Sequence, residues 1–346
     1  MIRALAHRLR RAADRALHPG GRGVVLLYHR VADEPSDPYA LCVTPAAFEE
    51  HLQAICATGR PMRLSDLADA VARDDVPDRA VCVTFDDGYA DNVDVAEPLL
   101  QRYGVPATMF VTTGRAGRER EFWWDELERI FLQTPTLPDS LELDLGGTTL
   151  RCAVGPLATM ADSITNGPRA ARAWHLLDVS APGSRRAAFR QAYDVVQQLA
   201  PDDRNRAMDA LVAWAGVAPA VRPARRALEP DEVAAMDARG IFDVGAHTVT
   251  HPALPRQAPD VQRAEIERSK RDLEAWTGHE VPGFAYPYGL YDEPAVHAVR
   301  DSGFRYACSC IYRHVRPDVE RFLLPRIEIT SGDGDEVARL LRWQLR

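Results

Sequence analysis

Short apolar runs alternate with amphipathic helical patterns along the first third of this chain, and this alternation limits the folds open to it. Residues 24–31, 80–85 and 107–113 are apolar runs of strand length. One helical pattern between them begins after Thr44, a residue type that commonly caps helix N-termini. Strands that alternate with helices at this spacing predict an α/β domain with a largely parallel sheet.

The alternation stops after residue 114 and resumes after residue 230. Helical patterns and one β-hairpin signal, centred on Gly146-Gly147, fill the segment between. We therefore expect one large domain interrupted by an insertion. The expected parts are a basic leader helix at 1–22, the first part of the domain at 23–114, a mostly helical insertion with a hairpin at 115–228, and the second part of the domain at 229–346.

Charge and cysteine usage narrow the classes of partner and compartment. The chain has 346 residues, a net charge of −8 and a pI near 5.7, which argues against a nucleic-acid binder and suits a neutral sugar or another small polar substrate. Its six cysteines contain no C-x-x-C pair. This usage predicts buried free thiols and a reducing compartment.

The N-terminal residues 1–22 are rich in arginine and amphipathic, but they lack the apolar core of a secretory signal. No stretch of the sequence approaches a membrane span. The segment is either an ordinary leader helix or a helix that contacts anionic lipid weakly. We expect a cytoplasmic protein, either free or peripheral to the inner face of the membrane.

A pair of adjacent carboxylates, Asp86-Asp87, follows directly after the apolar run 80–85. Strand ends in α/β domains are where functional side chains gather. A bound cation would offset the repulsion between the two, with one carboxylate as ligand and the other as proton acceptor. The alternative is a polar turn, because Asp-Gly is a common turn pair.

Two histidines, His247 and His251, stand four residues apart in the motif H-T-x-x-H. One helical turn or a loop would bring both rings to one ion. Such a pair also occurs by chance, so the hypothesis of a metal site becomes stronger when Asp87 is added as a third ligand. Two histidines and a carboxylate, with a position left for water, are typical of a catalytic rather than a closed structural metal site.

The motifs TFDDGY, H-T-x-x-H and FAYPYG, in this order, resemble those of the polysaccharide deacetylase family, also called the NodB-homology or carbohydrate esterase 4 family. LLYHRV and VTPAAFEEHL near the start resemble its poly-N-acetylglucosamine deacetylase-like branch. The resemblance covers residues 24–114 and 230–330 and leaves the insertion outside. It implies a distorted (β/α) barrel, often seven-stranded, with a divalent metal, usually Zn²⁺.

By position in the motifs, the resemblance gives each residue a role. Asp86 matches the general base, and Asp87, His247 and His251 match the metal ligands. Tyr288 matches the residue whose backbone N–H helps hold the oxyanion. The expected reaction is hydrolysis of an N-acetyl group on an amino sugar, in which Asp86 takes a proton from water and a general acid protonates the leaving amine.

The sequence departs from the family pattern in three places. Many members carry an arginine where this chain has Ala285, so we expect Arg326 to supply that guanidinium from another strand; the alternative is an arginine at the surface or core edge. The family's later aspartate motif is not recognisable. The usual C-terminal catalytic histidine is also absent, and Ile327-Glu328-Ile329 stands near its place.

The identity of the general acid is therefore open. His29 in LLYHRV is the candidate, because it ends a strand and because histidine as a residue type is suited to proton transfer near neutral pH. A satisfied buried histidine is the alternative. Three further histidines have no such context and are interpreted as exposed or structural: His279, His297 and His314.

Aromatic residues offer surfaces for stacking on sugar rings. Tyr286 and Tyr291 flank the FAYPYG turn, and we expect them to bind substrate. Trp123 and Trp124 either stack on sugar or belong to a helix core.

The function expected from these motifs is metal-dependent deacetylation of N-acetylated amino sugars in polysaccharide or glycoconjugate metabolism. Two alternatives stay open at this point. One is an O-deacetylase or other amide hydrolase on the same fold, and the other is a non-catalytic sugar-binding barrel.

Overall fold

The computed structural model describes residues 21–117, 120–145, 147–155 and 174–346, so nearly all of the expected leader helix lies outside the described residues. A parallel sheet forms the centre of the molecule. Its strand order is β11 (Tyr306–Cys308), β10 (Gly283–Ala285), β9 (Phe242–Ala246), β6 (Ala107–Val111), β5 (Ala80–Phe85), β1 (Gly23–Tyr28) and β12 (Ile327–Glu328), and β4 (Arg60–Pro61) also pairs with β5.

The two ends of this sheet are joined by the segment that leads into β12. Leu324 N–H donates a 2.8 Å hydrogen bond to Ala307 O, and Ser309 N–H donates one of 2.9 Å to Leu324 O. The same segment then pairs with β1 through Ile327. The sheet therefore curls into a distorted barrel, which confirms the predicted fold class.

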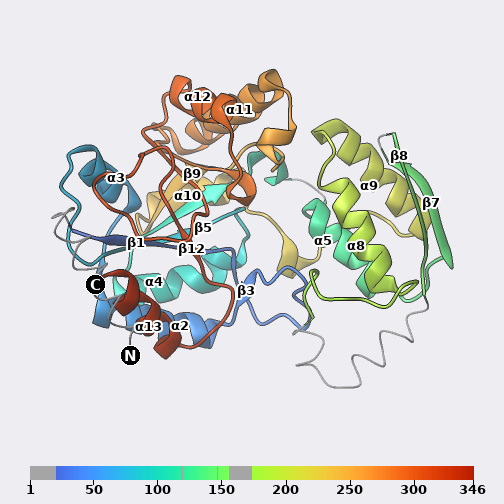
Figure 1. Ribbon diagram of the computed structural model, residues 1–346, viewed down its shortest axis with the longest axis horizontal. Coiled ribbons are helices and arrows are strands. Elements are labelled where there is room, and N and C mark those ends of the chain that lie inside the picture. Colours follow the sequence, from blue (N-terminus) through green and yellow to red (C-terminus); the bar gives the residue numbers. More distant parts are fainter. Residues whose placement is uncertain (1–20, 118–119, 146, 156–173) are drawn as a thin grey trace, which may run out of the picture.

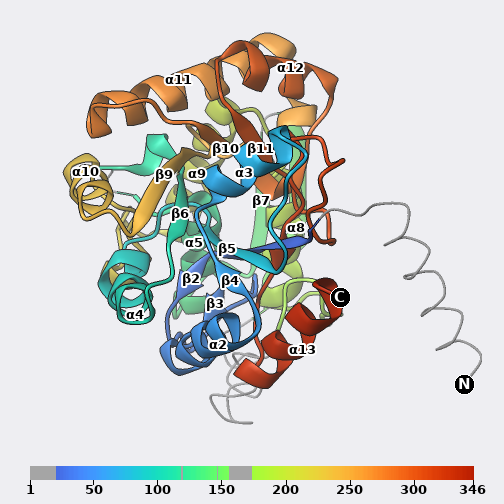
Figure 2. The same ribbon diagram turned by 90° about the vertical axis from the view of Figure 1, so that its left-hand side faces the viewer.

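Helices cover the outside of the barrel (Figure 2). Alternate strand residues face two separate cores. Val24 and Leu26 pack with most of these helices, whereas Val25 packs with Leu64 and Leu67 in another cluster. Thr44 caps the first helix by accepting a hydrogen bond from Ala47 N–H, as predicted. The helices are α2 (Pro45–Thr58), α3 (Leu64–Ala72), α4 (Glu97–Tyr103), α10 (Pro230–Ala238), α11 (Pro259–Thr277), α12 (Glu293–Asp301) and α13 (Gly334–Gln344).

The predicted insertion lies beside the barrel, on the right in Figure 1, and has a hydrophobic core of its own. The predicted hairpin is present as the antiparallel pair β7 and β8. The boundaries 115–228 and those of the other expected parts stay predictions. The insertion elements are α5 (Trp123–Glu128), a π-helical turn (Arg129–Gln133), β7 (Ser140–Leu145), β8 (Thr148–Ala153), α8 (Arg185–Val196) and α9 (Pro201–Ala215).

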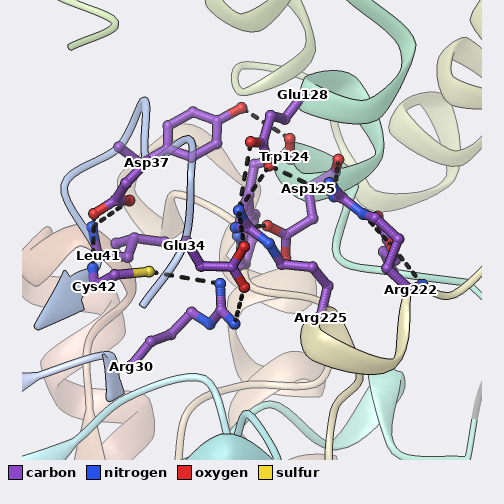
Figure 3. A network of polar contacts seen from close by, with 12 residues as sticks. Arg30, Glu34, Asp37, Leu41, Cys42, Trp124, Asp125, Glu128, Arg222 and Arg225 are labelled. Atoms are coloured by element: carbon purple, nitrogen blue, oxygen red, sulfur yellow. Dashed lines mark hydrogen bonds and ion pairs between the residues drawn. The ribbon is translucent and has the colours of Figure 1, made fainter. Parts of the chain in front are cut away.

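A buried ion-pair network ties the insertion to the barrel (Figure 3). Arg225 contacts Asp125 at 2.9 Å and Glu128 at 3.1 Å, both on α5 of the insertion, and it contacts Glu34 of the barrel at 3.6 Å. Arg30 lies in the short strand β2 (Arg30–Val31), which pairs with β3 (Cys42–Val43), and it contacts Glu34 at 3.0 Å. Charges this deeply buried are stable only when paired, so the network fixes how the two parts meet.

The six cysteines are all free thiols, as predicted, but only some are buried. Cys42, Cys82 and Cys308 are buried, whereas Cys56 and Cys310 are exposed. No helix in the described ranges has the length and apolar character needed to span a membrane.

Candidate active site

A cavity of about 490 Å³ opens at the carboxyl ends of the barrel strands. This is the end of a (β/α) barrel where catalytic groups gather, because the loops that follow the strands converge there. The residues that the barrel contributes to its lining are Leu27, His29, Asp86, Asp87, His247, His251, Tyr288, Cys310 and Glu328.

Asp86 is held by Arg326, which enters the barrel just before β12. The guanidinium donates one hydrogen bond of 2.7 Å to each carboxylate oxygen. Burial alone would raise the pKa of Asp86, but the charge and hydrogen bonds of Arg326 outweigh burial and lower that pKa below its usual value. Arg326 thus places beside Asp86 the guanidinium that Ala285 cannot supply from its own position.

Asp87, His247 and His251 converge on one point. Oδ1 of Asp87 lies 3.8 Å from Nε2 of His247 and 3.5 Å from Nε2 of His251. Nδ1 of His247 lies 2.7 Å from the carbonyl of Ala285, which can only accept, so Nδ1 carries the proton and Nε2 presents a lone pair. Burial lowers the pKa of His247 to about 4 and that of His251 well below its usual value, so both rings are neutral.

These three side chains fit a divalent metal ion. Oδ1 of Asp87 is buried without a hydrogen-bond partner among the described residues, and burial followed by the neighbouring Asp86 charge raises the pKa of Asp87 well above its usual value. A cation would offset both effects. Two ligands about 2.1 Å from a tetrahedral ion lie roughly 3.4 Å apart, close to the observed separations. The chemistry of the donors alone does not select zinc among divalent metals.

Backbone strain is concentrated at this site. Four of the seven described non-glycine residues with positive φ belong to it: Asp87 (73°), Thr248 (63°), His251 (58°) and Tyr288 (59°). Such conformations cost about 1–3 kcal/mol each and persist only where the surroundings enforce them. Thr248 contributes by accepting a 3.0 Å hydrogen bond from His251 N–H at its hydroxyl oxygen.

Tyr288 and His29 complete the part of the lining that the motifs predict. The Tyr288 ring packs edge-on against His251 with 4.5 Å between ring centroids. His29 follows β1, and its Nδ1 lies 3.5 Å from a carboxylate oxygen of Glu328. Its side chain is 16% exposed, so it is neither sealed in the core nor free in solvent.

The structure corrects the expectation for Tyr286 and Tyr291, because neither lines the cavity. Tyr286 is fully buried, with its ring 5.2 Å from that of Phe284 and 5.5 Å from that of Tyr291. The physical reason is strand alternation: Phe284 and Tyr286 leave β10 on the side of the outer helices. His279, His297 and His314 also lie outside the cavity.

The two neighbouring tryptophans have different positions. Trp123 is buried in the core of the insertion. Trp124 lines the cavity, and its ring lies edge-on to His251 at 4.9 Å. Its indole N–H donates a 2.8 Å hydrogen bond to Tyr89 Oη, which fixes its orientation.

Apart from Trp124, sequence reasoning missed the far wall of the cavity, which the insertion and the β2–β3 loop supply. Arg190, Tyr193 and Asp194 on α8 and Gln197 at its C-terminal cap recur at helical spacing and all line the cavity. This pattern points to the cavity only once the docking of α8 on the barrel is known. Arg190 and Asp194 pair across one turn at 2.9 Å. The other lining residues of this wall are Tyr39, Leu41, Trp124, His175, Leu176 and Leu177.

Comparisons with known proteins point to one family. A family model described as polysaccharide deacetylase matches residues 73–133 and 203–307. The poly-beta-1,6-N-acetyl-D-glucosamine N-deacetylase of Staphylococcus epidermidis is 27% identical over 105 residues, which are 28% of this chain and 36% of that protein. The chain spans less than half the length of the curated relatives that it matches.

Solved structures share the fold over nearly the whole chain. IcaB from Ammonifex degensii has a TM-score of 0.57 at 18% identity, with 94% of this chain and 98% of that one covered. The Streptococcus pyogenes deacetylase PplD in complex with acetate has a TM-score of 0.56 at 17% identity, with 94% and 99% covered. At these identities the likeness concerns the fold.

Proposed function

Because this chain belongs to the polysaccharide deacetylase family, we propose that it is a metal-dependent hydrolase that removes acetyl groups from N-acetylated amino sugars. One observation carries the proposal. A carboxylate kept ionised by a buried arginine, Asp86, stands beside three metal-type donor atoms that lie within 4.8 Å of one another. A general base next to a metal-bound water is the arrangement that amide hydrolysis at neutral pH requires.

In this proposal each residue has a separate task. Asp87, His247 and His251 hold the metal, which when bound supplies Lewis-acid polarisation of the acetyl carbonyl and a more acidic water. Asp86 takes a proton from the attacking water. Its pKa, lowered by Arg326, keeps it ready to do so at neutral pH.

Two further residues act on the substrate. The backbone N–H of Tyr288 donates to the oxyanion that develops on the acetyl carbonyl. His29 donates a proton to the leaving amine, with Glu328 as the carboxylate that orients its ring.

The wall formed by α8 supports a sugar substrate. It presents side chains that can hydrogen-bond hydroxyl groups, Asp194 and Gln197 among them, and the aromatic ring of Trp124 lines the same cavity. The net charge of −8 agrees with a neutral sugar rather than an anionic one. Zinc as the ion and a cytoplasmic location remain part of the proposal.

O-deacetylation is the second candidate on the same site. The missing arginine at Ala285 keeps this candidate open in the sequence, but Arg326 supplies an equivalent charge beside Asp86. N-deacetylation is therefore the function that we propose.

The test is acetate release by the zinc-loaded protein from N-acetylglucosamine oligomers, lipid-linked N-acetylated sugars and an O-acetylated sugar. We expect release from an N-acetylated substrate and its loss in Asp86→Asn. Preferential release from the O-acetyl sugar would replace the proposal with the second candidate, and full activity in Asp86→Asn would overturn the site assignment.

A further inference from the structure

The loop that carries His251 is clamped between two helices from different parts of the chain. On one side is Glu265, a buried carboxylate on α11 of the barrel. Its Oε2 accepts hydrogen bonds from Val249 N–H at 2.9 Å and from Thr250 N–H at 2.8 Å. Glu265 thus satisfies the N–H groups of the loop and leaves its carbonyls to another partner.

Arg204, on α9 of the insertion, provides that partner. Its guanidinium donates to the carbonyl of His251 at 3.3 Å and to the carbonyl of Thr250. The side chain is 1% exposed and lies over the Trp123 ring, 5.7 Å from its centroid. A residue of the insertion therefore reaches the backbone of a residue in the metal-type cluster.

The burial of Arg204 is costly and is not repaid by an ion pair. Among the described residues no carboxylate lies within salt-bridge distance of it, and its Nε has no hydrogen-bond partner. Burial lowers the pKa of Arg204 from its usual value, although a guanidinium stays charged. A buried cation without an ion-pair partner costs free energy of folding, and the carbonyls of Thr250 and His251 are the groups that it contacts in return.

We propose that Arg204 is a positioning residue for the metal ligand His251, so that the insertion completes the metal site of the barrel. This inference rests on the proposed metal site. His251 holds a strained φ of 58°, and its carbonyl is fixed by Arg204. When that hydrogen bond is removed, the backbone can relax toward a common conformation, which turns the His251 ring away from Asp87.

The test compares Zn²⁺ affinity in the full chain and in three variants: Arg204→Met, Arg204→Lys and Arg206→Met. Arg206 is the matched control because it lies on the same helix, is 71% exposed and pairs with Asp203. Apparent Kd is measured by competition with a chromophoric chelator, and the melting temperature of each metal-free protein is measured beside it. Arg204→Lys keeps the charge but replaces the planar guanidinium by a single ammonium on a shorter side chain, so it serves if Arg204→Met does not fold.

We expect Arg204→Met to bind Zn²⁺ about 10–100-fold more weakly than the unmodified chain, as is usual when the support of a metal ligand is lost. Arg204→Lys should fall between, and Arg206→Met should match the unmodified chain. Unchanged affinity in both Arg204 variants, even with a lowered melting temperature, would reduce Arg204 to a structural role and overturn the inference. If the unmodified chain bound no divalent metal, this inference and the proposed metal site would fail together, whereas acetate release by that chain tests the proposed function separately.

Discussion

Arg326 and Asp86 form a buried bidentate ion pair, with both hydrogen bonds at 2.7 Å, between residues 240 positions apart in the chain. Nε of Arg326 also donates to the carbonyl of Ser309 at 3.1 Å, so the guanidinium is fixed in its plane. A carboxylate buried without such a partner would take up a proton. The pair therefore determines whether Asp86 can act as a base.

Replacing Arg326 by glutamine should raise the pKa of Asp86, because burial then acts without the opposing charge. Asp86 accepts a proton only when ionised, so the acidic limb of the kcat/KM profile should move to higher pH. Activity at neutral pH should fall by about 10²–10⁴-fold. A pH–rate profile on an N-acetylglucosamine oligomer measures both effects.

Arg321→Gln is the control, because Arg321 lies over the Phe322 ring and away from the cavity. Its profile should superimpose on that of the unmodified enzyme. An acidic limb that stayed in place in Arg326→Gln would show that Asp86 is not the group that titrates there.

Separate roles for the two neighbouring aspartates give the second prediction. Asp86→Asn should keep Zn²⁺ affinity and lose about 10²–10⁴-fold in kcat, as is typical for a general base. Asp87→Asn should weaken Zn²⁺ binding by more than about 100-fold, since changes in outer-sphere support alone cost roughly 10–100-fold. Metal titration and single-substrate kinetics on both variants measure the difference. Equal loss of metal in the two variants would contradict the division of roles.

Much of this fold follows from local patterns in the sequence. The alternation of apolar runs and helical segments predicts the parallel sheet, and Thr44 predicts the start of α2. Motifs also place Asp86 and Asp87 at one strand end and the two histidines at another. These features are predictable because each depends on neighbouring residues in the chain.

Long-range features were harder to predict. The partner of Asp86 is Arg326, which lies 240 positions away in the chain and reaches Asp86 through the closure of the barrel. The sequence could therefore suggest Arg326 as a partner but could not establish the contact. The face of α8 that lines the cavity depends on how the insertion docks on the barrel. Tyr286 does not line the cavity, because the alternation of side chains along β10 turns it toward the outer helices.

The third prediction concerns His29 as the general acid. His29→Gln should lower kcat on an N-acetylated sugar by about 10²–10⁴-fold, because the amine leaves only when protonated. On 4-nitrophenyl acetate, whose leaving group departs as an anion, the same change should cost far less. Parallel assays on the two substrates measure this difference. Equal losses on both would mean that His29 acts before the leaving step.

Asp194 on α8 gives a test of the sugar-binding wall. If it accepts hydrogen bonds from sugar hydroxyls, Asp194→Ala should raise KM for an N-acetylglucosamine oligomer by roughly 10–100-fold, the equivalent of about 1.5–3 kcal/mol. The value of kcat should change little, because the contact is the same in the ground and transition states. Asp202→Ala removes the same charge from an exposed position outside the cavity and should leave KM unchanged. A fall in kcat alone would assign Asp194 to the chemistry instead.

The ion-pair network between the insertion and the barrel gives the last prediction, which concerns stability. Arg225 contacts Asp125 and Glu128, and all three side chains are almost completely buried. Arg225→Met should lower the free energy of unfolding by about 3–5 kcal/mol, because Asp125 then stays buried without its ion-pair partner and Glu128 keeps only its 3.5 Å contact with Arg222. Arg263→Met breaks an exposed pair with Asp301 and should cost less than about 1 kcal/mol. Urea unfolding of both variants measures the difference, and equal midpoints would show that the network contributes no more than a surface ion pair.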